Sequence, residues 1–211
     1  MEDVLELYAR KHDEREPVLC LDERPVVLHA DSRAPLPMAP GRIARRDYEY
    51  VRGGTANIFC IVEPVTGRRL TYATANRKRA AFVRSLQKIE RRYRGAKRIH
   101  LVMDNLNVHS QASAITVLGE LAGRRLWRRF AVHFTPKHAS WLNAAEIEAS
   151  LVSRECLGRD RVVSLAQLIS RVSAWRVATE RAHRTIDWKF RVHDARRVFR
   201  YSGLKTARSE Y

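Results

Sequence analysis

The sequence lacks the features that hold secreted and membrane proteins together. Its three cysteines, Cys20, Cys60 and Cys156, are widely spaced, odd in number and without a Cys-x-x-Cys pair. Each has apolar neighbours, so we expect buried, reduced thiols rather than a zinc site or a disulfide framework. No apolar run approaches the length of a membrane span, and the acidic segment 1–16 does not resemble a signal peptide. These absences predict a cytoplasmic protein.

Acidic residues are also scarce relative to basic ones. The 211 residues include 40 Lys and Arg against 23 Asp and Glu, a formal net charge of +17. Such proteins usually bind nucleic acid, because neutralising phosphates releases condensed counterions. The alternative is a highly charged, solvated surface. The basic residues concentrate in 77–98 and 171–200 whereas 1–16 is acid-rich, which favours one electrostatic face over a uniform coat.

The hydrophobic pattern predicts one α/β domain. Length and an apolar fraction of 45% suit a sizeable core with a peripheral extension. The expected strands are 18–23 with 26–29, 48–51, 56–62 paired with 69–74 as a hairpin, 99–104 and 130–134; 31–40 is expected as a loop and 52–55 as a turn. The expected helices are 2–11, 77–94, 110–121, 141–156 and 164–182. Early strands in meander order, then strands alternating with helices, predict a ribonuclease H-like fold: a mixed central sheet with helices on both faces.

Three acids stand in contexts that favour a metal site. Asp22 and Asp104 each end an apolar strand, and Glu146 begins a helix after Trp141. A carboxylate at such a strand end is expensive to bury unless it pairs or binds metal, and acids from two strand ends and a helix can converge on paired divalent ions. Each acid also has a simpler explanation. Asp104 could cap a helix or start a turn with Asn105, Asp22 could belong to a strand-end turn, and Glu146 could be solvated.

The residues next to these acids limit which side chains can share the site. Asp22 and Glu23 point to opposite sides of a strand, so only one of them is expected to face the metals. Glu146 and Glu148 lie about 200° apart around a helix and cannot share one site. Asn143 precedes Glu146 by one helical turn, where it could orient the carboxylate or a phosphate.

Three motifs together resemble a known family. They are Leu21-Asp22-Glu23, Asp104-Asn105-x-x-x-His109 and Trp141-Leu142-Asn143-x-x-Glu146. In this order they closely resemble the catalytic core of Tc/mariner-superfamily DDE transposases, and most closely the bacterial insertion-sequence 630 family. The resemblance makes Asp22, Asp104 and Glu146 the catalytic and metal-binding acids, with Asn105, His109 and Asn143 in support.

The resemblance implies metal-dependent cleavage and strand transfer of DNA. It implies two Mg²⁺ ions, with Mn²⁺ also acceptable, a TA-containing target, transposon ends as substrate, and a homodimer assembled on DNA near the bacterial nucleoid. Members normally carry helix-turn-helix modules before the core, and this sequence begins almost on the core. Two alternatives remain, a ribonuclease H-like nuclease without strand transfer and an inactive DNA-binding remnant.

Basic residues around the acids are the expected DNA contacts. They are Arg77, Lys78, Arg79, Arg84 and Lys88 in the first basic stretch, with Lys137 and His138 just before the Glu146 helix. The expected organisation is an N-terminal linker helix in 1–16, the ribonuclease H-like catalytic domain in 17–190, and a basic C-terminal tail in 191–211.

Overall fold

The structure is a computed structural model that describes residues 1–158 and 160–201. Its strands are β1 (Val18–Asp31), β2 (Tyr50–Glu63), β3 (Arg68–Arg69), β4 (Tyr72–Thr74), β5 (Ile99–Met103) and β6 (Phe130–Phe134). Its α-helices are α1 (Glu2–Ala9), α2 (Arg79–Arg92), α3 (Gln111–Leu118), α4 (Glu120–Trp127), α5 (Ala145–Leu151), α6 (Leu165–Arg181) and α7 (Val192–Phe199). A 3-10 turn, Ser140–Leu142, precedes α5, and a π-helical segment, Val152–Leu157, follows it.

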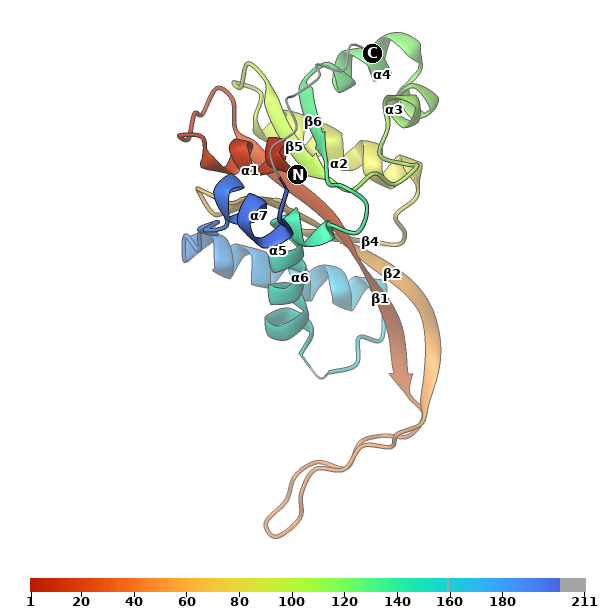
Figure 1. Ribbon diagram of the computed structural model, residues 1–211. Coiled ribbons are helices and arrows are strands. Elements are labelled where there is room, and N and C mark those ends of the chain that lie inside the picture. Colours follow the sequence, from red (N-terminus) through yellow and green to blue (C-terminus); the bar gives the residue numbers. More distant parts are fainter. Residues whose placement is uncertain (159, 202–211) are drawn as a thin grey trace.

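One mixed sheet organises the molecule (Figure 1). Its strand order is β3-β2-β1-β5-β6, with β4 also paired to β2. The β1–β2 and β2–β4 pairs are antiparallel, whereas the β1–β5 and β5–β6 pairs are parallel. The predicted change from an early meander to alternating strands and helices is therefore confirmed.

Helices cover both faces of this sheet, as predicted. On one face Leu19 and Leu21 of β1 pack with Phe82 of α2 in a cluster that also takes in α3 and α4. On the other face Ile58 of β2 packs with Leu168 of α6 in a cluster that includes α5. Alternation along the strands produces the two faces, since successive side chains point in opposite directions.

The turn expected at 52–55 is wrong, because these residues lie within the continuous strand β2. Val27 of β1 pairs with Thr55, and the register then shifts by a bulge before His29 pairs with Arg52. A Cβ atom on Gly53 would lie 3.4 Å from the Leu28 side chain, so a glycine here lets the strands pack closely. The two glycines therefore serve a bulged strand rather than a chain reversal.

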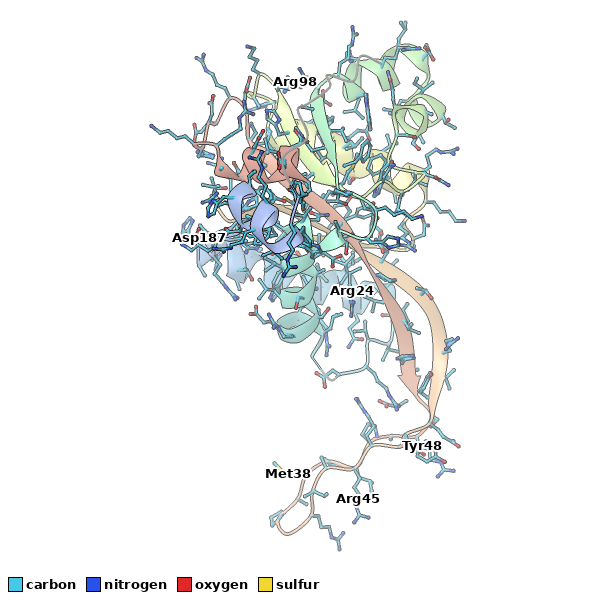
Figure 2. All side chains as sticks on the ribbon, viewed as in Figure 1. Arg24, Met38, Arg45, Tyr48, Arg98 and Asp187 are labelled. Atoms are coloured by element: carbon cyan, nitrogen blue, oxygen red, sulfur yellow. The ribbon has the colours of Figure 1, made fainter. Side chains whose placement is uncertain are left out.

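Beyond the bulge, residues 32–49 form a long arm between β1 and β2. Figures 1 and 2 show it reaching away from the body of the molecule, with Met38 and Arg45 near its tip and Tyr48 near its base. Isolated bridges join Leu36 to Arg45 and Ala39 to Arg42. Met38 is 79% exposed and Tyr48 87% exposed, so the arm contributes little to the core.

The helix predicted for 110–121 is two helices, because Gly119 takes a φ of 82° between α3 and α4. A Cβ atom on Gly123 would lie 2.6 Å from the backbone of Ile115, so α4 folds back closely on α3. Glycine supplies both the left-handed turn and the close approach.

The two terminal helices pack together. Val4, Leu5 and Leu7 of α1 are buried, and Arg196 of α7 forms hydrogen bonds of 2.8 and 2.9 Å with the Glu2 carboxylate. The sequence had predicted α1 but not α7, which occupies part of the expected tail. Residues 202–211 of that expected tail lie outside the described residues.

Two of the three free cysteines, Cys20 and Cys60, are fully buried, and Cys156 is half-buried. Among the described residues, no helix combines the length and apolar character needed to cross a bilayer.

A buried ion pair anchors α5 to the sheet edge. Arg69 donates a 2.9 Å hydrogen bond from Nε to Glu148, whose second oxygen accepts a 2.9 Å hydrogen bond from the Thr71 hydroxyl. Both charged side chains are fully buried. Such a pair adds little net stability over apolar packing, but losing one partner leaves an uncompensated charge in the interior.

We predict that Arg69→Met lowers the free energy of unfolding by about 3–5 kcal/mol, because Glu148 is then buried without a cation. The double variant Arg69→Met/Glu148→Leu should recover most of that loss. Urea unfolding at neutral pH measures both. A double variant no more stable than Arg69→Met would show that the charge imbalance is not the cause.

Candidate active site

Parallel pairing places two of the predicted acids at the same level of the sheet. The register of β1 against β5 joins Cys20 to Val102, and two residues further along each chain are Asp22 and Asp104. Asp22 lies within β1, where one carboxylate oxygen accepts a 2.8 Å hydrogen bond from the Glu23 N–H. Asp104 directly follows β5 and its side chain is 37% exposed.

The third acid, Glu146, is exposed in the first turn of α5. Asn143 ties the start of this helix to β1: its side-chain amide donates a 2.8 Å hydrogen bond to the Leu21 carbonyl, and its oxygen accepts one of 3.2 Å from the Ala145 N–H. Asn143 is only 2% exposed. It therefore acts through the backbone, by holding α5 beside the residue that precedes Asp22.

The three acids act on one another electrostatically. Burial and, to a smaller extent, the neighbouring charges of Glu146, Glu23 and Asp104 together raise the pKa of Asp22 to about 7, against the hydrogen bond from the Glu23 N–H, which lowers it. Like charges disfavour ionisation of a neighbour, so Asp104 and Glu146 lie near enough to Asp22 to act on its charge. Among the described residues, Asp22 forms no ion pair with a basic side chain.

His109 links Asp104 to Glu23. Its Nε2 lies 2.9 Å from the Glu23 carboxylate, and its Nδ1 lies 3.0 Å from the Asp104 carbonyl oxygen and 2.7 Å from Asp104 Oδ1. The His109 and Glu23 side chains are buried. Burial alone would lower the pKa of His109, but the hydrogen bonds to Asp104 and Glu23 outweigh it and raise the pKa to about 10.

These contacts of His109 change the prediction about Glu23. Glu23 was expected to point away from the site because its neighbour Asp22 faces it. It does lie on the other side of β1, yet through His109 it reaches Asp104. The ring of Phe82 packs against the His109 ring, with 4.6 Å between the ring centres.

The donor atoms at the site suit a hard divalent cation. Oδ1 of Asp104 is buried beside His109 Nδ1, which lies between this oxygen and the Asp104 carbonyl oxygen. Glu23, Asp104 and His109 also offer ligand atoms within 4.8 Å of one another. We favour the Asp22, Asp104 and Glu146 set for the metal, because both ring nitrogens of His109 are already engaged and carboxylate oxygens suit Mg²⁺ and Mn²⁺.

The predicted DNA contacts form two groups near the acids, and the side chains of both groups are exposed. Lys137 and His138 are in the loop after β6, at the sheet edge where Asp104 lies. The other group lies just before α2 and along it, and Phe82 of this helix contacts His109. Its members are Arg77, Lys78, Arg79, Arg84 and Lys88. Asn105 is exposed directly after Asp104.

Two buried acids were missed by sequence reasoning. Glu23 was assigned no role, although a second acid beside Asp22 in a buried strand needs a partner. Glu148 was also assigned no role, and it is fully buried against Arg69. Its spacing of two from Glu146 put it on the opposite face, but nothing local to the sequence identified Arg69, 79 positions away.

We predict that, without metal, the protein becomes less stable as pH rises through about 7. The folded state raises the pKa of Asp22 above its ordinary value, so between about pH 4 and 7 the folded chain binds a proton that the unfolded chain has released. Stability from this group is present at low pH and lost as Asp22 ionises. Asp22→Asn should therefore reduce the loss between pH 5.5 and pH 8 by roughly 1–2 kcal/mol.

Urea unfolding in a chelator at the two pH values measures this difference. Asp13→Asn, a change at an exposed aspartate, is the matched control and should leave the pH dependence as in the wild type. An identical pH dependence in wild type and Asp22→Asn would contradict the shift.

Comparison with solved structures gives the fold. The Mos1 mariner paired-end complex with Mn matches with 17% identity and a TM-score of 0.53, covering 84% of this chain and 52% of that chain. The Mos1 strand transfer complex matches with 16% identity and a TM-score of 0.55, covering 84% and 51%. This chain therefore spans about half the length of the Mos1 chains and shares the ribonuclease H-like fold of their matching part.

Comparison with protein families gives the membership. No curated protein sequence matches this chain significantly. The family model for the DDE superfamily endonuclease matches residues 17–169, which is well over half of the chain and contains Asp22, Asp104 and Glu146. The chain belongs to the DDE superfamily of endonucleases.

Proposed function

We propose that this chain is the catalytic core of a DNA transposase, which cleaves DNA strands and joins a freed end to a target. The observation that carries the proposal is the convergence of Asp22, Asp104 and Glu146 from β1, β5 and α5 in a member of the DDE superfamily. The likeness of the fold to that of the Mos1 transposase complexes supports the same reading. The motifs of the sequence favour the insertion-sequence 630 branch.

The three acids are the proposed ligands of two divalent cations. Three carboxylates carry about −3 and two Mg²⁺ or Mn²⁺ ions carry +4, so the loaded site still attracts a phosphate. When bound, such ions activate the attacking water or 3′-hydroxyl and stabilise the leaving oxygen. One of the similar Mos1 complexes contains Mn.

The remaining residues of the site hold the acids in place. Glu23 orients His109, and His109 contacts Asp104 and limits the movement of its side chain. Asn143 sets the position of α5 and therefore of Glu146. No Ser or Tyr nucleophile is required, because water and the 3′-hydroxyl supply the attacking oxygens.

The proposed substrate is duplex DNA: the ends of a transposon and a TA-containing target. The basic residues on both sides of the acids would hold the phosphate backbone. The similar Mos1 structures are a paired-end complex and a strand transfer complex. For this chain they support a homodimer that assembles on DNA.

We predict that Asp104→Asn abolishes Mg²⁺-dependent strand cleavage while leaving DNA binding without metal nearly intact. The amide keeps the shape of the side chain but cannot supply the negative oxygen that a hard cation needs. Cleavage of a labelled duplex, with wild type beside the variant, measures the loss. Retained cleavage in Asp104→Asn would show that Asp104 is not a ligand of the catalytic metal.

A joining reaction with a pre-cut 3′-end separates the alternatives. Joined products identify a transposase, and cut but unjoined products identify a nuclease. A folded wild-type chain that binds DNA, gains no stability from Mg²⁺ and cuts nothing would be the inactive remnant.

We predict that Glu23→Gln lowers the cleavage rate about 10–100-fold and raises the Mg²⁺ concentration needed for half of the maximal rate. The amide weakens the contact that holds His109, so Asp104 becomes less well placed for the cation. Added Mg²⁺ should restore part of the rate. The measurement is a metal titration of cleavage.

Glu63→Gln is the matched control. Glu63 is also a buried glutamate that contacts a histidine, with 3.0 Å between its carboxylate and His12 Nε2. It ends β2 three residues beyond Cys60, the partner of Asp22, and its carboxylate accepts hydrogen bonds from Thr66 and Tyr93. Its substitution should leave the Mg²⁺ requirement unchanged. Equal changes in the two variants would mean that Glu23 only stabilises the fold.

A further inference from the structure

A cationic groove runs along the outer edge of the sheet at β4. It has a volume of about 460 Å³ and lies between α2 and α6, which cover opposite faces of the sheet and approach each other around β4. Figure 1 shows β4 beside β2. Its polar lining comes from Thr71, Tyr72, Lys88, Arg91, Ser173 and Arg176.

The basic side chains of this groove are not balanced by acids. Arg84, Lys88 and Arg91 follow one stripe of α2 at helical spacing, and Arg176 faces them from α6. No acidic residue is among those that line the groove. Glu180 on α6 binds Arg176 at 3.2 Å and Arg92 at 3.1 Å, so its single charge is shared by two guanidinium groups.

Lys88 shows the effect of these neighbouring positive charges. Burial lowers its pKa, and the charges of Arg91, Arg176 and Arg84 lower it further, with no acid acting in the opposite direction. Its ammonium lies 4.4 Å from the centre of the Tyr72 ring, a cation–π contact that holds it over β4. Like charges gathered from two helices destabilise the chain by repulsion unless an anion joins them.

Tyr72 connects the groove to the acids. Its ring stacks on Phe59 with 5.6 Å between ring centres, and Phe59 is the β2 partner of Glu23 in β1. The Tyr72 hydroxyl is buried and has no partner among the described residues. Tyr72 is therefore two strand spacings, about 10 Å, from Glu23, on the face of the sheet opposite to the one toward which Asp22 points.

We propose that this groove holds the sugar–phosphate backbone of the DNA substrate outside the acid site. The inference rests on the proposed function of the site. Guanidinium and ammonium groups are the usual partners of phosphate oxygens, and releasing counterions from the DNA adds to the affinity.

A purely structural role for these cations makes different predictions. Charged residues beside an edge strand can serve only to prevent pairing with a second molecule. In that case removing them would promote self-association of the protein and leave the salt dependence of DNA binding unchanged.

The test compares two triple variants that each lose one lysine and two arginines. The groove variant is Lys88→Gln/Arg91→Gln/Arg176→Gln, and the control is Lys11→Gln/Arg125→Gln/Arg128→Gln, at exposed positions outside the groove. Binding to a short duplex is measured without metal from 50 to 200 mM salt (about the range in which phosphate contacts are resolved). The slope of log K against log salt should fall by about two to three in the groove variant and by less than one in the control.

A second measurement places the contact along the DNA. Single methylphosphonate substitutions remove one backbone charge at a time, and those at the phosphates that the groove holds should weaken binding by the wild type. The same substitutions should have little effect on the groove variant. Equal slopes in the groove and control variants, or interference that is the same in wild type and groove variant, would overturn the proposal.

These measurements are independent of catalysis because they contain no metal. A groove variant with a reduced slope supports the groove even if the wild type cuts no DNA, which would count only against the proposed function. Unchanged slopes together with wild-type cleavage would overturn the groove and leave the proposed function standing.

Discussion

The geometry of this protein depends on a short stretch of parallel pairing between β1 and β5. These strands are adjacent in the sheet although a meander and a helix separate them in the chain. Their register puts Asp22 and Asp104 at the same level, where two carboxylates repel each other and one of them is largely buried. Parallel pairing buried on both faces is stiff enough to hold this unfavourable arrangement, because shifting either strand by one residue would turn its apolar side chains away from their cluster.

The third acid is held by a different mechanism. Glu146 is on a helix that could rotate or slide. One buried polar contact before Glu146 and one after it prevent these movements. Asn143 fixes the start of α5 to the Leu21 carbonyl, and Glu148 binds Arg69 at the opposite edge of the sheet. The exposed acid therefore stands between two buried anchors, which explains why buried polar side chains surround a short helix.

Much of this arrangement could be predicted from the sequence, and the failures have physical causes. The apolar runs before Asp22 and Asp104 were recognisable because a charge rarely follows a fully apolar run without a purpose, although β1 continues beyond Asp22 to Asp31. The turn at Gly53 and Gly54 was wrong because glycine serves close packing as readily as chain reversal. The partners of Glu23 and Glu148 could not be predicted, since His109 and Arg69 are distant in the chain and only the folded sheet brings them close.

The thiols of this protein differ in accessibility. Burial raises the pKa of Cys20 to about 12 and that of Cys60 well above its ordinary value, so neither forms the thiolate that reacts with alkylating reagents. Cys156 is half-buried on the π-helical segment after α5, in the cluster that joins α5 to α6. Burial also raises the pKa of Cys156, but its side chain remains partly accessible, unlike the two buried thiols. The protein therefore carries one accessible thiol for a fluorophore, on the segment that follows the helix of Glu146, and no cysteine needs to be added or removed to follow that helix in solution.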